Sequence, residues 1–239
     1  MTFDRPAVHN AIGPATICEI SPILDHLESA SEVVALIVTG SGERTFVSGG
    51  DIRELEQITT YEAAAAMSRE MQTLMNRMSG LHVAVIGAIN GDSFGGGCEV
   101  ALACDVRIAS SRARFAFKQV TIGITPAWGG RERLLAAVGR AAALRLLLTG
   151  EMIDAAQALR IGLVDSVVEP AGVMAAAMEL AKSIAANSHG AVRAIKRALH
   201  EGHLMEPRQA AEFEADIFAR TWISEDHLSA VEAWKRRRG

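Results

Sequence analysis

Two glycine-rich stretches are the parts of this sequence best suited to chemistry. One is "FVSGGDIREL" (46–55) and the other is "AINGDSFGGGCE" (88–99), which ends on Glu99. Within the second stretch, the letters GDSFG fit the G-x-S-x-G turn that presents the nucleophile of many serine hydrolases. The same residues therefore allow two chemistries: a nucleophilic serine, or backbone N–H donors beside a carboxylate.

Ser93, the serine of that turn, lacks the surroundings of a hydrolase nucleophile. In hydrolases the helix begins directly after the serine, whereas here Phe94 and three glycines follow, and glycine is a poor helix former. An HGGG-type oxyanion loop is missing upstream. The later histidines all fall in the predicted helical tail, at His189, His200, His203 and His227. We interpret Ser93 as a turn residue.

The glycines indicate loops that bind a ligand through their backbone N–H groups. Neither 39–50 nor 91–97 matches the Walker or the dinucleotide-binding pattern. Both loops follow predicted strands, and 95–97 leads into a predicted helix, whose first N–H groups have no intrahelical acceptor. Two such loops could donate to one oxygen and form an oxyanion hole. Two tight turns without a function are the alternative interpretation.

The elements that would position these loops alternate along the first part of the chain. Short apolar runs rich in β-branched residues predict strands at 33–38, 83–89, 106–109, 115–117 and 163–168. Helical patterns lie between them at 14–29, 61–79, 97–104, 130–148 and 154–161. This alternation predicts a layered α/β fold.

From about residue 170 the strand signal ends, and four helical segments follow, punctuated by glycine and proline. We assign residues 1–185 to the α/β core and residues 186–239 to a C-terminal helical region. Phe213, Ile217 and Trp222 fall on roughly one side of a helix, which exposes more apolar surface than a small tail can bury. The tail is therefore expected to drive self-association.

Composition excludes several classes of partner. A net charge of −4 disfavours nucleic acid and anionic membranes. The N-terminus has no signal-peptide pattern, and no apolar run approaches the ~20 residues of a membrane span. Three cysteines, at positions 18, 98 and 104, show neither zinc-site nor disulfide spacing. We expect a cytoplasmic protein without a metal, with reduced and partly buried thiols.

Several segments resemble the crotonase family, the enoyl-CoA hydratases and isomerases. The segments are "DRPAVHNAI" (4–12), "FVSGGDIREL" (46–55), "GGGCEVALACDVRIAS" (95–110), "TPAWGGRERLLAAVGRAAALRLLLTG" (125–150) and "DAAQALRIGLVDSVV" (154–168). The resemblance implies a spiral of ββα units whose C-terminal helices contact neighbouring subunits in a homotrimer or hexamer. It also implies a strand before "DRP", which this chain either lacks or holds only in shortened form.

The resemblance further implies that an acyl-CoA thioester binds with its oxygen at the N–H groups of Gly50 and Gly96, beside Glu99 as acid/base. The substrate carries the coenzyme A, so no separate cofactor is expected. The implied coenzyme A-binding residues are Ala7, Val8, Gly49, Asp51, Ile52, Arg53 and Trp128. Arg53 could equally be a surface arginine. Trp128, before Gly129-Gly130, could line the acyl pocket or could equally be a packing residue.

One position departs from the family pattern. Hydratases of the family carry a second glutamate twenty residues after the first, where this sequence has Gln119. A glutamine can hydrogen-bond a water but cannot take its proton. We therefore expect an enoyl-CoA hydratase/isomerase with Glu99 as the only acid/base. A malonyl-type CoA-ester decarboxylase and a non-catalytic, RNA-binding family member are the alternatives, and the net charge disfavours the latter.

Overall fold

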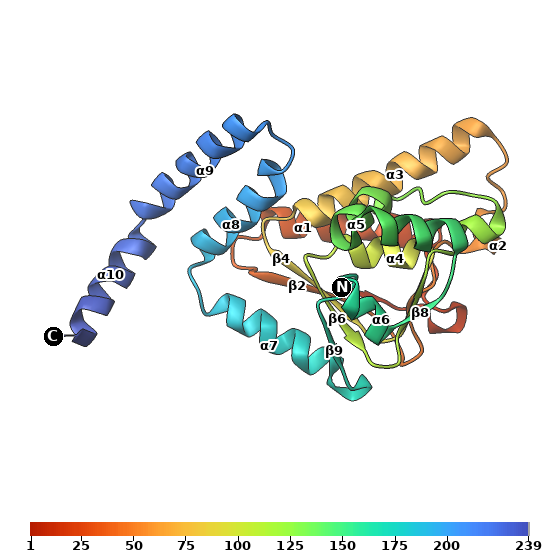
Figure 1. Ribbon diagram of the computed structural model, residues 1–239, viewed down its shortest axis with the longest axis horizontal. Coiled ribbons are helices and arrows are strands. Elements are labelled where there is room, and N and C mark those ends of the chain that lie inside the picture. The colour runs from red at the N-terminus through yellow and green to blue at the C-terminus, as the bar shows by residue number, and fades with distance from the viewer. Residues whose placement is uncertain (239) are drawn as a thin grey trace.

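The computed structural model describes residues 1–238, and two β-sheets form the centre of the molecule (Figure 1). The larger sheet is parallel, in the order β1-β2-β4-β6-β9: Thr2–Phe3, Ala35–Gly40, Ala84–Ile89, Val106–Ser110 and Ser166–Val168. The smaller sheet has the order β3-β5-β7-β8: Thr45–Val47, Asp92–Phe94, Arg114–Ala116 and Ile153–Asp154, with β8 antiparallel to β7.

The chain passes repeatedly from the larger sheet to the smaller sheet and then into a helix. Strands β2, β4 and β6 are followed by β3, β5 and β7, and each pair leads onward to helical structure. Successive pairs advance by one strand in both sheets, since β2-β4-β6 and β3-β5-β7 are each neighbours. This arrangement confirms the predicted spiral of ββα units. It also places the glycine-rich ends of β3 and β5 side by side, because Val47 pairs with Ser93.

Ten α-helices occur within residues 1–238. Their bounds are α1 Pro14–Ser29, α2 Ile52–Leu55, α3 Tyr61–Gly80, α4 Gly96–Leu102, α5 Gly130–Thr149, α6 Ala155–Arg160, α7 Val173–Ala185, α8 His189–Gly202, α9 Pro207–Trp222 and α10 Glu225–Arg238. Helix α7 covers one face of the larger sheet, where Val173 and Ala177 pack on Ile86 and Ile108. The main core holds buried side chains of α1, α3 and α4 together with those of both sheets.

The C-terminal helices differ in how they meet the core. Helix α8 is attached to it: Lys196 Nζ donates to the Val83 carbonyl at 2.7 Å and pairs with Asp105 at 2.6 Å. Helices α9 and α10, drawn in blue, lie away from both sheets (Figure 1). The 185/186 domain boundary stays a prediction. None of the helices in residues 1–238 has the length and apolar character needed to cross a membrane.

One sequence expectation was wrong in detail, since Ser93 is the middle residue of strand β5 and is not in a turn. A strand of two residues precedes Asp4, because Thr2–Phe3 pairs with β2, so of the two alternatives for the first strand its absence is excluded. The strands β3, β5 and β8 were missed: each has only two or three residues, too few to show a periodic pattern, whereas β7, equally short, was predicted from the apolar run at 115–117. Of the three cysteines, Cys98 and Cys104 are buried as expected, while Cys18 is exposed.

Candidate active site

The two glycine-rich loops are in backbone contact. Gly49 has φ +101°, and a side-chain carbon at this position would lie 3.0 Å from the Gly96 nitrogen and 3.1 Å from the Phe94 oxygen. Any other residue would therefore be strained in conformation and would push the loops apart. The requirement for glycine at position 49 thus has a physical cause, which is the close approach of the end of β3 to the start of α4.

The backbone donors left without partners in these loops include the N–H groups of Gly50 and Gly96. Around Gly50, the Ile12 N–H donates to the Gly49 carbonyl at 2.8 Å, and the Asp51 N–H donates to the Ile12 carbonyl at 2.9 Å. Neither hydrogen bond uses the N–H of Gly50. Gly96 is the first residue of α4, where an N–H has no intrahelical acceptor. Within the described chain, neither N–H is hydrogen-bonded. Gly96 is buried and Gly50 is half-buried, and since most buried N–H groups in proteins are paired, these two are candidate ligand donors.

Glu99 lies one helical turn beyond Gly96 and is only 1% exposed. Its Oε1 accepts the Trp128 N–H at 2.8 Å and the Gly130 N–H at 3.0 Å, and its Oε2 accepts from Gln119 Nε2 at 3.0 Å. Burial raises the pKa of the carboxyl group, while hydrogen bonds from the backbone and from Gln119 act in the opposite direction. Glu99 is therefore a buried carboxyl in a fixed orientation whose proton affinity exceeds that of an exposed glutamate.

The segment that holds Glu99 is itself fixed by glycine and by α3. A side-chain carbon at position 130 would lie 2.4 Å from Glu99 Cγ, so only glycine fits there. The Ala127 carbonyl accepts from Ser68 Oγ at 2.9 Å and from Gln72 Nε2 at 3.1 Å, both on α3. As a result the N-terminus of α5 meets the carboxylate, an arrangement that the helix dipole favours.

Of the two polar side-chain atoms of Gln119, one makes a hydrogen bond and the other has no partner. It lies in a 3₁₀ turn, Lys118–Ile122, directly after β7, and is 7% exposed. Its Nε2 donates to Glu99, whereas its Oε1 is buried and has no partner in the described structure. A buried acceptor without a donor is uncommon and indicates a place for a water or a ligand group. No second carboxylate contributes to the pKa of Glu99.

Known proteins resemble this chain along its full length. The model of the family described as enoyl-CoA hydratase/isomerase matches residues 1–239. This chain belongs to that family. A short-chain-enoyl-CoA hydratase of Clostridium acetobutylicum is 40% identical, with 100% of this chain and 91% of the relative covered. A crotonyl-CoA hydratase of Syntrophomonas wolfei is 36% identical, with 99% and 90% covered.

A solved structure agrees with this assignment. An enoyl-CoA hydratase from Bacillus anthracis superposes with a TM-score of 0.94 at 31% identity, over 99% of this chain and 91% of that one. The crotonase fold is thereby confirmed, and the chain is an enzyme of the hydratase/isomerase family.

The residues predicted to bind coenzyme A lie in several separate elements, whereas the residues around Glu99 are in direct contact with it. Val8 and the exposed Ala7 form a 3₁₀ turn, Pro6–Val8, while Ile52 and Arg53 are exposed at the start of α2. Asp51 is buried, and its carboxylate pairs with Arg5 at 3.2 Å. Asp51 therefore ties the Arg-Pro segment to the Gly-Gly-Asp loop.

Sequence reasoning missed two contributors that the structure shows. Arg5 bridges Asp51 and Glu54 and donates to the Ala11 carbonyl, which fixes the position of the Gly50 loop. Gly130 supplies one of the donors to Glu99. A Gly-Gly pair at the start of a helical pattern was the available signal for Gly130, and the family-like segment "DRPAVHNAI" was the available signal for Arg5.

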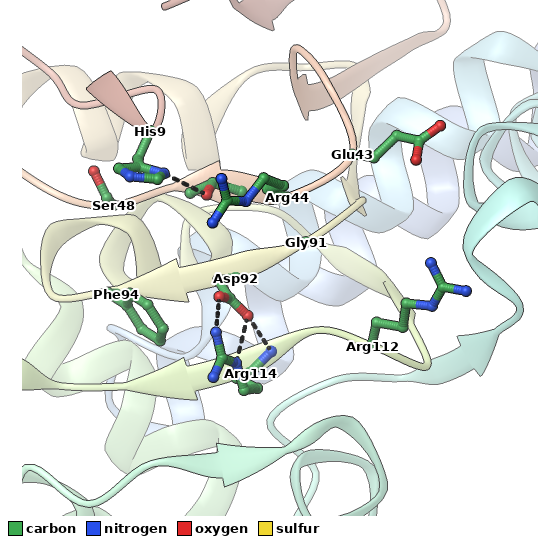
Figure 2. A pocket seen from close by; sticks show the side chains of 10 residues that line it. His9, Glu43, Arg44, Ser48, Gly91, Asp92, Phe94, Arg112 and Arg114 are labelled. Atoms are coloured by element: carbon green, nitrogen blue, oxygen red, sulfur yellow. Dashed lines mark hydrogen bonds and ion pairs between the residues drawn. The ribbon is translucent and has the colours of Figure 1, made fainter. Parts of the chain in front are cut away.

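A hydrolase chemistry at Ser93 is not supported by its position. The side chain is 0% exposed, and its Oγ has no hydrogen-bond partner. Its neighbours Asp92 and Phe94 point to the opposite face of β5, as alternate strand residues must. They line a separate pocket of about 530 Å³ with His9, Arg44 and other residues (Figure 2).

The pocket in Figure 2 is distinct from the Glu99 site. Arg114 is engaged there by Asp92, and His9 contacts Thr45 at 3.3 Å. Gly50, Gly96, Glu99 and Gln119 are not among the residues that line this pocket. The candidate active site of this family member is therefore the buried group around Glu99.

Proposed function

We propose that this enzyme hydrates a 2-enoyl-CoA, with the thioester oxygen bound by the N–H groups of Gly50 and Gly96 and with Glu99 as its only acid/base. The observation that carries the proposal is the pair of unbonded N–H groups on touching loops, one helical turn before a buried carboxyl. The names of the two relatives, a short-chain-enoyl-CoA and a crotonyl-CoA hydratase, support hydration.

The two N–H groups would act on the charge that develops at the thioester oxygen. When a nucleophile adds to C3 of the enoyl group, the electron pair of the double bond moves toward that oxygen and forms an enolate. Fixed N–H donors stabilise such an oxyanion without having to reorganise, and loss of one donor typically costs about 100- to 1,000-fold in rate. The glycines permit close approach because they have no side chain at the contact.

Glu99 would carry the proton through both halves of the addition. In its ionised form it takes one proton from a water as the water oxygen bonds to C3. It then gives that proton to C2 as the enolate collapses, so the hydroxyl ends on C3 and the proton on C2. The raised pKa of Glu99 suits both steps, since a general acid/base works best near the operating pH.

Gln119 would hold the water and not ionise. Its unpaired Oε1 can accept a hydrogen bond from the O–H of the water that Glu99 does not deprotonate, while its Nε2 keeps the carboxylate in place. An amide cannot accept a proton from water at neutral pH. Gln119 is thus a positioning group for both the nucleophile and the acid/base.

The coenzyme A moiety would extend from the thioester across exposed groups on the same loops. Val8 and Ala7 offer backbone and apolar contacts, and Gly49 brings the loop against Gly96. Ile52 and Arg53 stand at the exposed start of α2. The Arg53 guanidinium has no partner within residues 1–238 and would be available to a phosphate.

The donor role is tested at Gly50, because any side chain at position 96 would strike Trp128 at 2.2 Å. Gly50→Pro removes the N–H, and Gly50→Ala is the matched control that keeps it. In both variants the new side-chain carbon at position 50 would lie 2.7 Å from Leu55 Cδ1, the end of a flexible side chain, so both variants introduce the same contact. We expect crotonyl-CoA turnover by Gly50→Pro to be at least about 100-fold below that of Gly50→Ala. Equal turnover by two folded variants would exclude Gly50 as a donor.

A second candidate reaction follows from the same residues. A site with an oxyanion hole and one carboxylate also suits decarboxylation of a malonyl-type CoA ester, which needs no second base. Double-bond isomerisation likewise needs only one carboxylate. Mass spectrometry of products from crotonyl-, 3-hexenoyl- and methylmalonyl-CoA separates the three reactions. Carbon dioxide release without hydration would replace the hydratase proposal with decarboxylation.

A further inference from the structure

The indole of Trp128 packs against the Cα atoms of both glycines that carry the candidate oxyanion donors, on the side where a side chain would stand. A side-chain carbon at position 96 would lie 2.2 Å from Trp128 Cζ3 and 2.6 Å from Cη2. A side-chain carbon at position 50 would lie 3.6 Å from Cζ2 and 3.9 Å from Cη2 of the same ring. The outer edge of the six-membered ring therefore spans from one glycine to the other, and the side chain is only 6% exposed.

The backbone of Trp128 has little freedom to retreat. Its N–H donates to Glu99 at 2.8 Å, and the preceding carbonyl, that of Ala127, is held by Ser68 and Gln72 of α3. The following residue, Gly129, has φ +84° and is the N-cap residue of α5. Only rotation of the side chain can enlarge the space, and the close packing around the ring opposes rotation.

We propose that Trp128 determines acyl-chain length and restricts this enzyme to short, planar enoyl groups. The proposal rests on the proposed function, because it requires the thioester oxygen at Gly50 and Gly96 and C2 and C3 beside Glu99. With those atoms in place, the flat enoyl group lies along the indole edge. Carbons beyond the double bond would then extend toward the ring, which already fills the side of both glycines where a side chain would stand.

The test is a chain-length series measured on side-chain variants. Every non-proline substitution at 128 keeps the N–H that binds Glu99, so the carboxylate stays oriented. We expect kcat/KM of the wild type to fall at least about tenfold from crotonyl-CoA to trans-2-decenoyl-CoA. In Trp128→Ala the decenoyl-to-crotonyl ratio should rise at least about tenfold, with Trp128→Phe between the two. Tyr61→Ala, an exposed aromatic truncation at the start of α3, is the control and should leave the ratio unchanged.

Two outcomes would overturn the proposal. One is a wild type that processes decenoyl-CoA as well as crotonyl-CoA. The other is a Trp128→Ala variant that loses the same factor on every substrate, which is what a purely structural role predicts. If the wild type turns over no enoyl-CoA, the proposed function fails instead. Calorimetry with butyryl- and decanoyl-CoA then tests the role of Trp128. The affinity for decanoyl-CoA relative to butyryl-CoA should rise in Trp128→Ala. An unchanged ratio would refute the proposed role of Trp128.

Discussion

At the scale of single residues, the contact between Glu99 and Gln119 sets the chemistry. The two side chains are 3.0 Å apart, and the amide donates to the carboxylate. A second carboxylate at position 119 would repel Glu99 and share one proton with it. The glutamine removes that repulsion but leaves the site with a single proton acceptor. Because only Glu99 can take a proton from water, we predict a slow hydratase whose rate is limited by the activation of water.

Gln119→Glu is the change that tests this limit. The substitution is nearly isosteric, so packing should change little, while the new group can accept a proton from the bound water. General acid–base assistance typically contributes about 10²–10⁴-fold, and we expect crotonyl-CoA hydration to rise at least tenfold. The double variant with Glu99→Gln should lose the gain, because both carboxylates are then required. If the wild type already hydrates crotonyl-CoA rapidly, the one-carboxylate mechanism is wrong.

The pH dependence of the wild type follows from the raised pKa of Glu99. The base form of Glu99 disappears as the pH falls through that pKa, so kcat/KM should decline on the acidic side at a higher pH than for an exposed glutamate. In Gln119→Glu the shared proton should move this decline to still higher pH. Steady-state rates from about pH 4, near the pKa of an exposed glutamate, to pH 9 measure both effects. A flat profile for both proteins would exclude Glu99 as the titrating group.

At the scale of elements, the short helix α4 matters because it packs directly on the backbone of β3. A side-chain carbon at Gly97 would lie 1.8 Å from the Val47 oxygen, which is fixed main chain. Gly97→Ala should therefore lower the free energy of unfolding by at least about 2 kcal/mol, since overpacking typically costs 1–3 kcal/mol. Gly202→Ala is the control, because position 202 in α8 is open, and it should raise stability by up to about 1 kcal/mol.

Chemical denaturation of the two variants measures this difference. If Gly97→Ala is as stable as the wild type, α4 can slide on β3, and the relative position of Gly96 and Gly50 is not fixed by this contact. Activity should fall with stability in Gly97→Ala, because any shift of α4 moves both Gly96 and Glu99. Gly202→Ala should keep full activity.

The elements predicted from the sequence are those with enough residues to show a period. Helices such as α1 and α3 follow apolar spacing over sixteen and twenty residues, and their bounds were predicted to within one residue. The three-residue strands β3 and β5 carry no such signal, although they place the glycine loops together. They are held by pairing with neighbouring strands, which is a property of the tertiary structure.

The candidate site was predictable to a similar degree. Gly50, Gly96 and Glu99 were identified from glycine spacing and family resemblance, and the structure brings their loops together. The unpaired Gln119 Oε1 and the indole edge of Trp128 could not be predicted, because both depend on the path of residues 119–130 around Glu99. That path is fixed by contacts with α3, distant in sequence.

At the scale of the whole molecule, the exposed apolar surface of the C-terminal helices is the main unexplained feature. Helices α9 and α10 lie away from the sheets (Figure 1). Large apolar side chains remain exposed on the last three helices and in the turns between them: Ile195, Leu199, Leu204, Phe218, Trp222, Ile223, Leu228 and Trp234. The core also exposes Ile122, Ile124 and Leu148. Clusters of this kind are typical of protein–protein contacts, and a second copy of the chain carries both sets.

We propose a homotrimer or hexamer in which α9 and α10 of one subunit cover exposed apolar groups of the next. Sedimentation velocity should give a particle three or six times the 25.4-kDa chain mass. Phe218→Asp with Ile223→Asp places two charges among groups that are 59% and 74% exposed in the single chain, so folding should survive while assembly fails. Glu212→Lys, an exposed charge reversal on the same helix, should leave the assembly intact. A monomeric wild type at micromolar concentration would contradict the proposal, and an unchanged assembly in the double variant would move the contact away from this part of α9.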